Sequence, residues 1–187
     1  MVLLELIVGG LLVLVAIGLI ILFVGIYNRF QTLKNSAEAT LGQIKVAMKK
    51  RLDMIEQLLG SVRSYAKFER ETFEKVTELR ARVGTASPSE LADVERESRT
   101  LLGRLIAVAK AYPDLKTNTT VMSLMDAVRN VEDEIARQRY TYNNIAQQYN
   151  TMTDTVPSNF VARIVGFIKL QYLQFEEAIA TPPRIEF

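Results

Sequence analysis

The sequence predicts an all-α protein with a single N-terminal transmembrane helix followed by a long-helix antiparallel bundle. Three observations predict this fold. Residues 6–26 form an uncharged apolar run, the apolar residues that follow recur about every 3.6 positions, and no segment alternates as a strand would. Because 49% of the 187 residues are hydrophobic, the chain can bury the core of one ordinary domain. We therefore expect an anchor over residues 1–28, a helical bundle over residues 29–170 and a C-terminal tail over residues 171–187.

The apolar run is a candidate membrane anchor. At a rise of about 1.5 Å per residue, residues 6–26 span about 31 Å, which matches the hydrocarbon core of a bilayer. A cleaved signal peptide is the alternative, but no Lys or Arg precedes the run and no small-residue cleavage site follows it. Only Glu5 precedes the run whereas several basic residues follow it. The positive-inside rule then predicts a single-pass protein of the cell membrane, with its N-terminus outside and its C-terminal domain in the cytoplasm. Gly18 and Gly25 share one face, where a neighbouring span can approach closely, although the run contains no GxxxG motif.

Three helices are expected after the anchor. Apolar residues with a helical period begin at Phe30, and no proline interrupts them before Pro88, which predicts one helix from the membrane to about Val83. The stretch GTASPSE, residues 84–90, supplies a helix stop, a Ser N-cap and a proline, so a second helix follows and ends at the turn in AYPDLK, residues 111–116. A third helix starts near Val121 and stops before Pro157.

The expected helix lengths predict self-association. They are about 80, 33 and 58 Å, so the apolar seam of the longest helix would lack a partner within the chain. We therefore expect a homo-oligomer.

The chain after Pro157 contains the apolar segment NFVARIVGFIKL, residues 159–170, with Phe160, Ile164 and Phe167 as docking residues. Its apolar positions cover most of a helix circumference, so it must dock on membrane or on protein. The expected lengths place it at the membrane-distal end of the bundle, which favours docking on its own or a neighbouring bundle.

The composition argues against most enzymes. Neither Cys nor His is present, which removes a cysteine nucleophile, the commonest general base and the commonest metal ligand. No nucleophile, base or phosphate loop is recognisable, so we expect no catalytic activity and no cofactor. The net charge of +2 comes without a basic block, so nucleic acid is not an expected partner. An acidic run is interleaved with cations, which favours a surface helix rich in salt bridges over a divalent-metal site: Glu69, Glu71, Glu74 and Glu78.

Four charged residues are candidates for structural ion pairs or assembly contacts: Arg51, Asp53, Glu132 and Arg139. Arg51 lies at the edge of the seam of the first helix, so its stem packs while its guanidinium needs an acceptor. Glu132 and Arg139 flank the seam of the third helix. We expect Glu132 to pair with Arg51 across the bundle, and Arg139 to share the carboxylate. Asp53 projects on the opposite face, away from the bundle, where we expect it to affect assembly more than folding.

Two tyrosines lie within the seam of the third helix. Tyr142 and Tyr149 are seven positions apart, which favours core residues that use their hydroxyls at the edge of the seam. A ligand-binding aromatic pair is the alternative.

Several irregular motifs resemble the LemA family in order and spacing. They are YNRFQTL, KKRLDMIEQLL, KFERETFEKV, AYPDLKTN, VEDEIARQRYTYN and PSNFVARIVGF, which together cover the chain from Tyr27 to about Gly166. The resemblance implies a membrane-anchored helical bundle with no established enzymatic activity, and MamQ-like proteins are among the relatives it implies.

Two functions follow from the pattern and the resemblance. The favoured one is a structural or scaffolding protein that self-associates through a cytoplasmic helical bundle and organises or shapes membrane. The alternative is an adaptor or binding module for a membrane partner, for which the resemblance suggests an HtpX-type protease. The expected partners are thus the lipid bilayer, further copies of the chain, and a membrane protease or other membrane protein.

Overall fold

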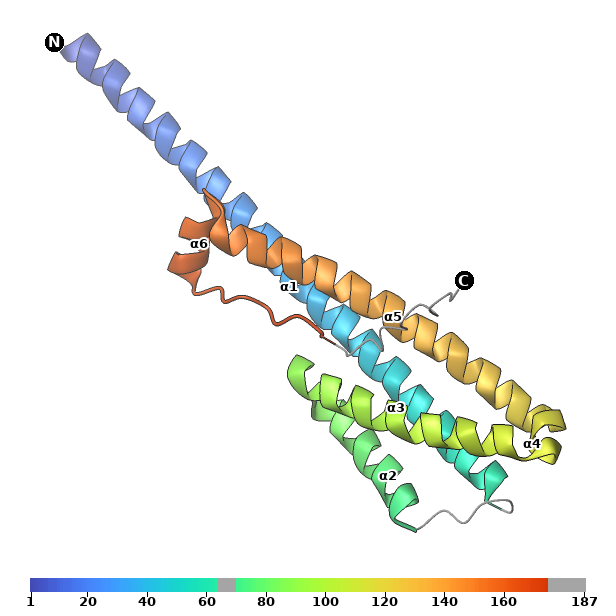
Figure 1. Cartoon of the computed structure of the whole chain (residues 1–187). Helices are drawn as coiled ribbons and strands as arrows, with labels where there is room; N and C mark the ends of the chain where they lie inside the picture. Colours follow the sequence, from blue (N-terminus) through green and yellow to red (C-terminus); the bar gives the residue numbers. More distant parts are fainter. Residues whose placement is uncertain (64–69, 175–187) are drawn as a thin grey trace, which may run out of the picture. The chain divides into compact units, whose positions relative to one another are not determined.

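The computed structural model describes residues 1–63 and 70–174, which contain six helices and no strand (Figure 1). The all-α class is therefore confirmed. The helices are α1 (Val2–Val62), α2 (Arg70–Thr85), α3 (Pro88–Ala111), α4 (Pro113–Thr117), α5 (Thr119–Asp154) and α6 (Ser158–Val165). Much of the predicted tail, residues 175–187, lies outside the described residues.

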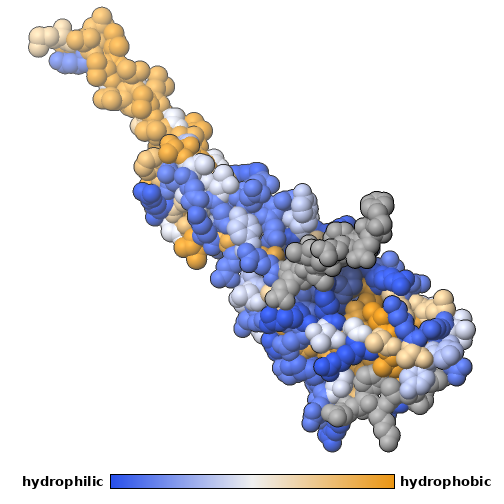
Figure 2. Space-filling view, viewed as in Figure 1, coloured by the Kyte–Doolittle hydropathy of each residue, from blue (hydrophilic) through white to orange (hydrophobic). Residues whose placement is uncertain are grey.

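The first part of α1 is the candidate membrane span. It is long and apolar enough to cross a membrane, with a mean hydropathy of 3.2, and none of it is buried against the rest of the protein. Figure 2 shows it as an almost continuous apolar surface. Such a surface is unfavourable in water and favourable in hydrocarbon, as the sequence analysis expected.

The predicted continuous helix to about Val83 is wrong, because α1 ends at Val62 and α2 is a separate helix. The two helices are antiparallel, because an earlier residue of α1 contacts a later residue of α2. Lys45 donates to the carbonyl oxygen of Gly84 at 3.4 Å, and Glu56 accepts from Arg80 at 2.8 Å. The return buries apolar side chains of α2 that an unbroken helix would leave without cover, namely Val76, Leu79 and Val83. Gly60, a position where the first helix could bend, lies within α1, and residues 64–69 contain neither Gly nor Pro, so no helix-breaking residue follows Val62 directly.

The described chain forms two compact units. Unit 1 combines residues 1–40 with residues 141–171, and unit 2 contains residues 41–140 with the described residues from Tyr172 onward. The helices α1 and α5 each contribute to both units.

Unit 1 has an aromatic core that α1, α5 and α6 share. Phe30 packs edge-on against Tyr149, with ring centroids 5.2 Å apart, and Phe167 lies 4.7 Å from Phe30. Leu33 and Ala162 complete the buried cluster, and the partly buried hydrophobic residues around it include Ile26, Ile145, Met152, Phe167 and Leu170. The core of unit 1 thus begins at the last residue of the apolar run.

A left-handed glycine turns the chain back after α6. Gly166 has φ 82°, and the backbone N–H groups of Gly166 and Phe167 both donate to the carbonyl oxygen of Ala162 at 2.9 Å. Residues with a Cβ adopt this conformation only at a cost, so glycine fits here. The turn directs Phe167 back onto Phe30.

Polar contacts fix the segment after α6 along α5. The side-chain amide of Asn150 donates to the carbonyl oxygen of Leu170 at 2.9 Å and accepts from the N–H of Leu170 at 2.8 Å. The hydroxyl of Tyr142 donates to the carbonyl oxygen of Gln171 at 3.0 Å. These contacts satisfy backbone groups of a segment that has no helix or strand of its own.

Unit 2 is built around α3, which begins as the sequence predicted. Ser87 accepts a hydrogen bond from the N–H of Glu90 at 3.4 Å, and the carboxylate of Glu90 accepts from the N–H of Ser87 at 2.7 Å, with Pro88 at the first helical position. This is a capping box. α3 and α2 are in contact with each other and lie side by side in Figure 1.

The apolar seam of α1 is covered within the chain. Its buried positions are each at most 5% exposed: Phe30, Leu33, Ala37, Ile44, Met48, Leu52, Ile55, Leu59 and Val62. The prediction that part of this seam lacks a partner within the chain is therefore wrong. It assumed one helix from the membrane to Val83, whereas α1 is shorter and α2 is a separate helix.

Candidate functional site

Arg51 is the centre of a polar network in the core of unit 2. Its side chain is fully buried, although the sequence placed it only at the edge of the seam. One terminal nitrogen, Nη1, donates to Glu132 of α5 at 2.8 Å. The other, Nη2, donates to Glu95 and to the hydroxyl of Ser98, both on α3 and both at 2.5 Å. A single side chain of α1 thus bonds to α3 and α5.

A second arginine completes the network. Arg99 donates to Glu95 at 2.8 Å and lies 3.5 Å from Glu132, so two cations face two carboxylates. Burial opposes the charge on Arg51, but Glu95 and Glu132 outweigh this effect and raise the pKa of Arg51. Burial likewise opposes ionisation of Glu95, but Arg51 and Arg99 outweigh it and lower the pKa of this carboxyl. Arg51 and Glu95 are therefore both charged near neutral pH.

This arrangement fits structural cross-linking better than acid–base chemistry. A general base needs a pKa near the operating pH and a free lone pair directed at a substrate. Glu95 has a lowered pKa, its side chain is 3% exposed and its oxygens already accept from two arginines. The network therefore ties α1, α3 and α5 together.

The structure brings together some of the predicted residues and not others. Arg51 and Glu132 are paired, as expected from their seam-edge positions. Arg139 lines a shallow groove together with Glu95, Arg99 and Glu132, and Arg99 lies 3.5 Å from the carboxylate of Glu132. Glu95, Ser98 and Arg99 of α3 were not predicted from the sequence. The sequence did carry a signal for two of them, because the polar residues Glu95 and Ser98 occupy positions in the otherwise apolar buried stripe of α3. The stripe has helical spacing and consists of Leu91, Val94, Glu95, Ser98, Leu102, Leu105 and Ala109.

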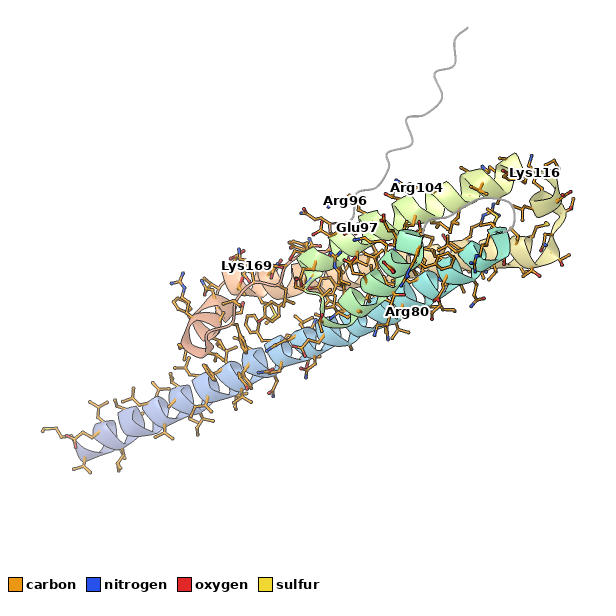
Figure 3. The ribbon with its side chains drawn as sticks, turned by 90° about the horizontal axis from the view of Figure 1, so that it is seen from below. Arg80, Arg96, Glu97, Arg104, Lys116 and Lys169 are labelled. Carbon is orange, nitrogen blue, oxygen red and sulfur yellow. The ribbon has the colours of Figure 1, made fainter. Side chains whose placement is uncertain are left out.

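Asp53 was predicted to point away from the bundle, but it contacts α2. Arg80 of α2, which is labelled in Figure 3, donates to Asp53 and also to Glu56, at 2.8 Å for the latter. The projection of α1 was correct, but the returning α2 lies along the face that was expected to meet solvent or another copy. Asp53 remains 52% exposed, so it belongs to a surface ion cluster.

The acidic run lies among cations, as the sequence predicted. Glu74 pairs with Arg70, Glu78 pairs with Lys75, and Glu97 of α3 accepts from Lys75 at 2.7 Å and from Arg82 at 2.9 Å. Glu69 lies outside the described residues. Within the described part of the chain, no group of three or more acidic side chains is arranged to hold a metal ion.

The predicted docking segment divides into two faces. Phe167 packs into unit 1 against Tyr27, Phe30 and Tyr149. Phe160 and Ile164 instead point outward and are 57% and 74% exposed. The predicted membrane-distal position is wrong, because Tyr27 and Phe30 directly follow the candidate span. The unpredicted break after Val62 adds one helix to the bundle and so reverses the direction expected for α5.

The two tyrosines of α5 are core residues. Tyr142 and Tyr149 are 3% and 2% exposed, and burial raises the pKa of both hydroxyls. Tyr142 uses its hydroxyl on a backbone carbonyl, as described above, and Tyr149 packs on Phe30. Both contacts are structural, which agrees with the favoured interpretation of the sequence.

Across residues 1–63 and 70–174 these features define a class of protein: an all-α chain with one N-terminal candidate membrane span that continues directly into a helical bundle. The chain belongs to the LemA family, whose model matches residues 40–187. The resemblance found in the sequence motifs is thereby confirmed.

Curated relatives of the chain carry two names. Protein LemA of Metamycoplasma hominis is 27% identical over 157 residues, covering 83% of this chain and 72% of the relative. Magnetosome protein MamQ 2 of Paramagnetospirillum magneticum is 26% identical over 183 residues, and magnetosome protein MamQ of Magnetospirillum gryphiswaldense is 24% identical over the same length. Each of these two alignments covers 83% of this chain and 67% of the relative.

Proposed function

We propose that the chain is a membrane-anchored structural protein that self-associates and organises membrane from the cytoplasmic side. One observation carries the proposal. The candidate span and the core of unit 1 belong to one unbroken helix, in which Ile26 packs against the core and Phe30 is fully buried. No linker separates the membrane anchor from the folded body.

This continuity favours a fixed platform. A flexible linker would let a tethered domain sample a volume that grows with linker length. Here the first fully buried residue, Phe30, follows the apolar run by four positions, or about 6 Å of helix. Unit 1 is thus held against the membrane surface, which suits a protein that organises the membrane or its own neighbours.

The face of the span that carries Gly18 and Gly25 supports self-association. Nothing lies within 4 Å of a Cβ placed at either glycine, so this face is open in the single chain. The two residues are seven positions apart and share one side of the helix, where small residues allow close packing in lipid. The seam of α1 offers no such surface, since the chain itself covers it. Two relatives are named magnetosome proteins, which supports a role in membrane organisation.

The test uses the full-length chain in mild detergent and in vesicles. We expect it to stay with membranes through alkaline carbonate washing and to form oligomers by light scattering and cross-linking. The double variant Gly18→Leu/Gly25→Leu should reduce oligomer formation several-fold. Gly9→Leu is the matched control, because Gly9 lies nine residues from Gly18 and therefore on the opposite face, and its site is equally open.

Two results would contradict the proposal. Release of the chain by carbonate would contradict the anchor. A monodisperse monomer at every protein concentration would contradict self-association and would favour the adaptor function instead.

A further inference from the structure

We propose that α6 is an interfacial helix that inserts Phe160 and Ile164 into the bilayer beside the span, so that each chain contacts the membrane at two places. The occupant of this exposed apolar face is lipid. The inference rests on the proposed function only in that α1 must be retained as a membrane anchor.

The inner face of α6 fixes its position in unit 1. Val161 and Ala162 are buried, and Ala162 belongs to the aromatic core. Phe167, directly after the C-terminal glycine, lies 5.9 Å from Tyr27 and 4.7 Å from Phe30. α6 is therefore attached to the part of α1 that follows the span (Figure 1).

The outer face of α6 is apolar and uncovered. Phe160 and Ile164 are four residues apart, which places them on the same side of the helix. Both are mostly exposed, and Ile168 beyond the helix is 81% exposed. With Val165 at 39%, four large apolar side chains are exposed in one short segment. Such an arrangement is unfavourable in water and marks an interaction surface.

The helical rise gives the depth of this surface. Tyr27 and Phe30 follow the last residue of the apolar run by one and four positions, which is about 1.5 to 6 Å along the helix. The headgroup region on each side of the hydrocarbon core is about 5 to 7 Å thick. The residues that hold α6 thus lie within this region once residues 6–26 fill the core. Tyrosine is also enriched at this level of the membrane.

The charges near α6 fit an anionic lipid surface. Arg163 is exposed on the helix between Phe160 and Ile164, and Lys169 follows it with its side chain 58% exposed and 2.8 Å from Asp154. A helix with apolar side chains and cations on its outer side lies in the plane of the interface, with the cations at the phosphates. A second copy of the chain is the competing occupant, and the experiment distinguishes the two.

The chain contains no tryptophan, so Phe160→Trp supplies a single fluorescent probe at an exposed position. The full-length variant is reconstituted in vesicles of phosphatidylcholine and phosphatidylglycerol, with and without lipids that carry a nitroxide high on the acyl chain. We expect blue-shifted emission and strong quenching by the nitroxide. Glu38→Trp is the control: it is an exposed site of α1 in unit 1, about 18 Å of helix beyond Ile26, and should be quenched several-fold less.

A further substitution tests the face itself. In the Phe160→Trp background, Ile164→Glu should lower the quenching several-fold, whereas Ile164→Leu should leave it unchanged. Both positions are exposed, so matching helical content and thermal unfolding would show that the fold is kept.

Each contrary result has its own meaning. The chain could remain in the membrane after carbonate washing while its tryptophan shows the emission of a water-exposed side chain. This result would overturn the proposal of an interfacial helix and leave the anchor intact. Blue-shifted emission without quenching by lipid nitroxides would show a protein contact and would also overturn it. Release of every variant from the vesicles would instead contradict the proposed function.

Discussion

Arg51 shows how a buried charge can be kept in an apolar core. Moving an ion out of water costs several kcal/mol even after relaxation, and mutual attraction repays this only with close geometry and further hydrogen bonds. Arg51 has two carboxylates and a hydroxyl within hydrogen-bonding distance, so most of its donors are satisfied. The residue therefore specifies how α1, α3 and α5 meet in unit 2, because a shifted register would leave its charge unpaired.

The first residue-scale prediction concerns which partner of Arg51 matters more. Arg51→Ala and Glu95→Ala should each lower the free energy of unfolding by about 3–5 kcal/mol, because each leaves a buried charge without its partner. Glu132→Ala should cost less, since the side chain of Glu132 is 26% exposed and water can replace it. Chemical unfolding of a fragment that starts at Gly25 measures these losses. Double-mutant cycles should give a larger coupling energy for Arg51 with Glu95 than with Glu132. Additive losses in the Glu95 cycle would refute this assignment.

The second residue-scale prediction is a dependence of stability on pH. The ordinary pKa of a glutamate is near 4.5, and that of Glu95 is lowered in the folded protein, so the unfolded chain binds its proton first as pH falls. The stabilisation from Glu95 is therefore complete above the ordinary value and is lost as pH falls through the lowered one. Glu95→Gln should destabilise the protein at neutral pH, and its difference from the unsubstituted chain should shrink in acid. Unfolding curves between neutral and acidic pH test this, and a constant difference would contradict it.

At the scale of elements, α2 is held by burial more than by its ion pairs. Arg80 and its partners Asp53 and Glu56 are between 37% and 52% exposed, and exposed pairs contribute at most about 1 kcal/mol. Fully burying a single Val or Leu side chain contributes about 1.5–3 kcal/mol. The apolar stripe of α2 therefore accounts for most of its attachment, and the charged residues around it favour one register.

The element-scale prediction concerns the turn after α6. Gly166→Ala should lower the free energy of unfolding by about 1–2 kcal/mol, because a residue with a Cβ is strained at this positive φ and Phe167 would lose its place on Phe30. Gly103→Ala in α3 is the control. It lies within a helix with open space around its Cβ, so it should be neutral or stabilise by up to about 1 kcal/mol. Thermal unfolding followed by circular dichroism compares the two, and equal effects would argue against a role for the turn.

The sequence predicted the elements whose signals are local. The apolar run, the serine cap before α3 and the stop before Pro157 depend on residue types at fixed positions. The break after Val62 has no such signal, because burial of Val76 and Leu79 against the rest of unit 2 decides it. Glu95 illustrates the same limit for the site: its place in the stripe of α3 was readable, but its meeting with Arg51 depends on the register between helices. Because the end of α1 at Val62 was not predicted, the surroundings predicted for Asp53 and Phe160 were also wrong.

At the scale of the whole molecule, α1 connects the candidate membrane span to the folded units. Its apolar run is the candidate span, and the same helix continues into the core of unit 1. Positive residues near the end of a span set its orientation, and Arg29 and Lys34 lie within eight positions of Ile26. The positive-inside rule therefore predicts that the folded units lie on the cytoplasmic side.

The whole-molecule prediction tests that orientation with single cysteines, since the chain has none of its own. Val2→Cys and Asn35→Cys change no charge, and both positions are exposed on opposite sides of the apolar run. In intact cells a membrane-impermeant maleimide should label Val2→Cys and should not label Asn35→Cys. Permeabilising the membrane should expose Asn35→Cys to the reagent, because it lies about 14 Å of helix beyond Ile26 and outside the hydrocarbon. The reverse pattern would place the units outside the cell. A chain that lacks the Val2→Cys label and has lost the mass of its first residues would show that the apolar run is cleaved, and the continuous helix could then not act as an anchor.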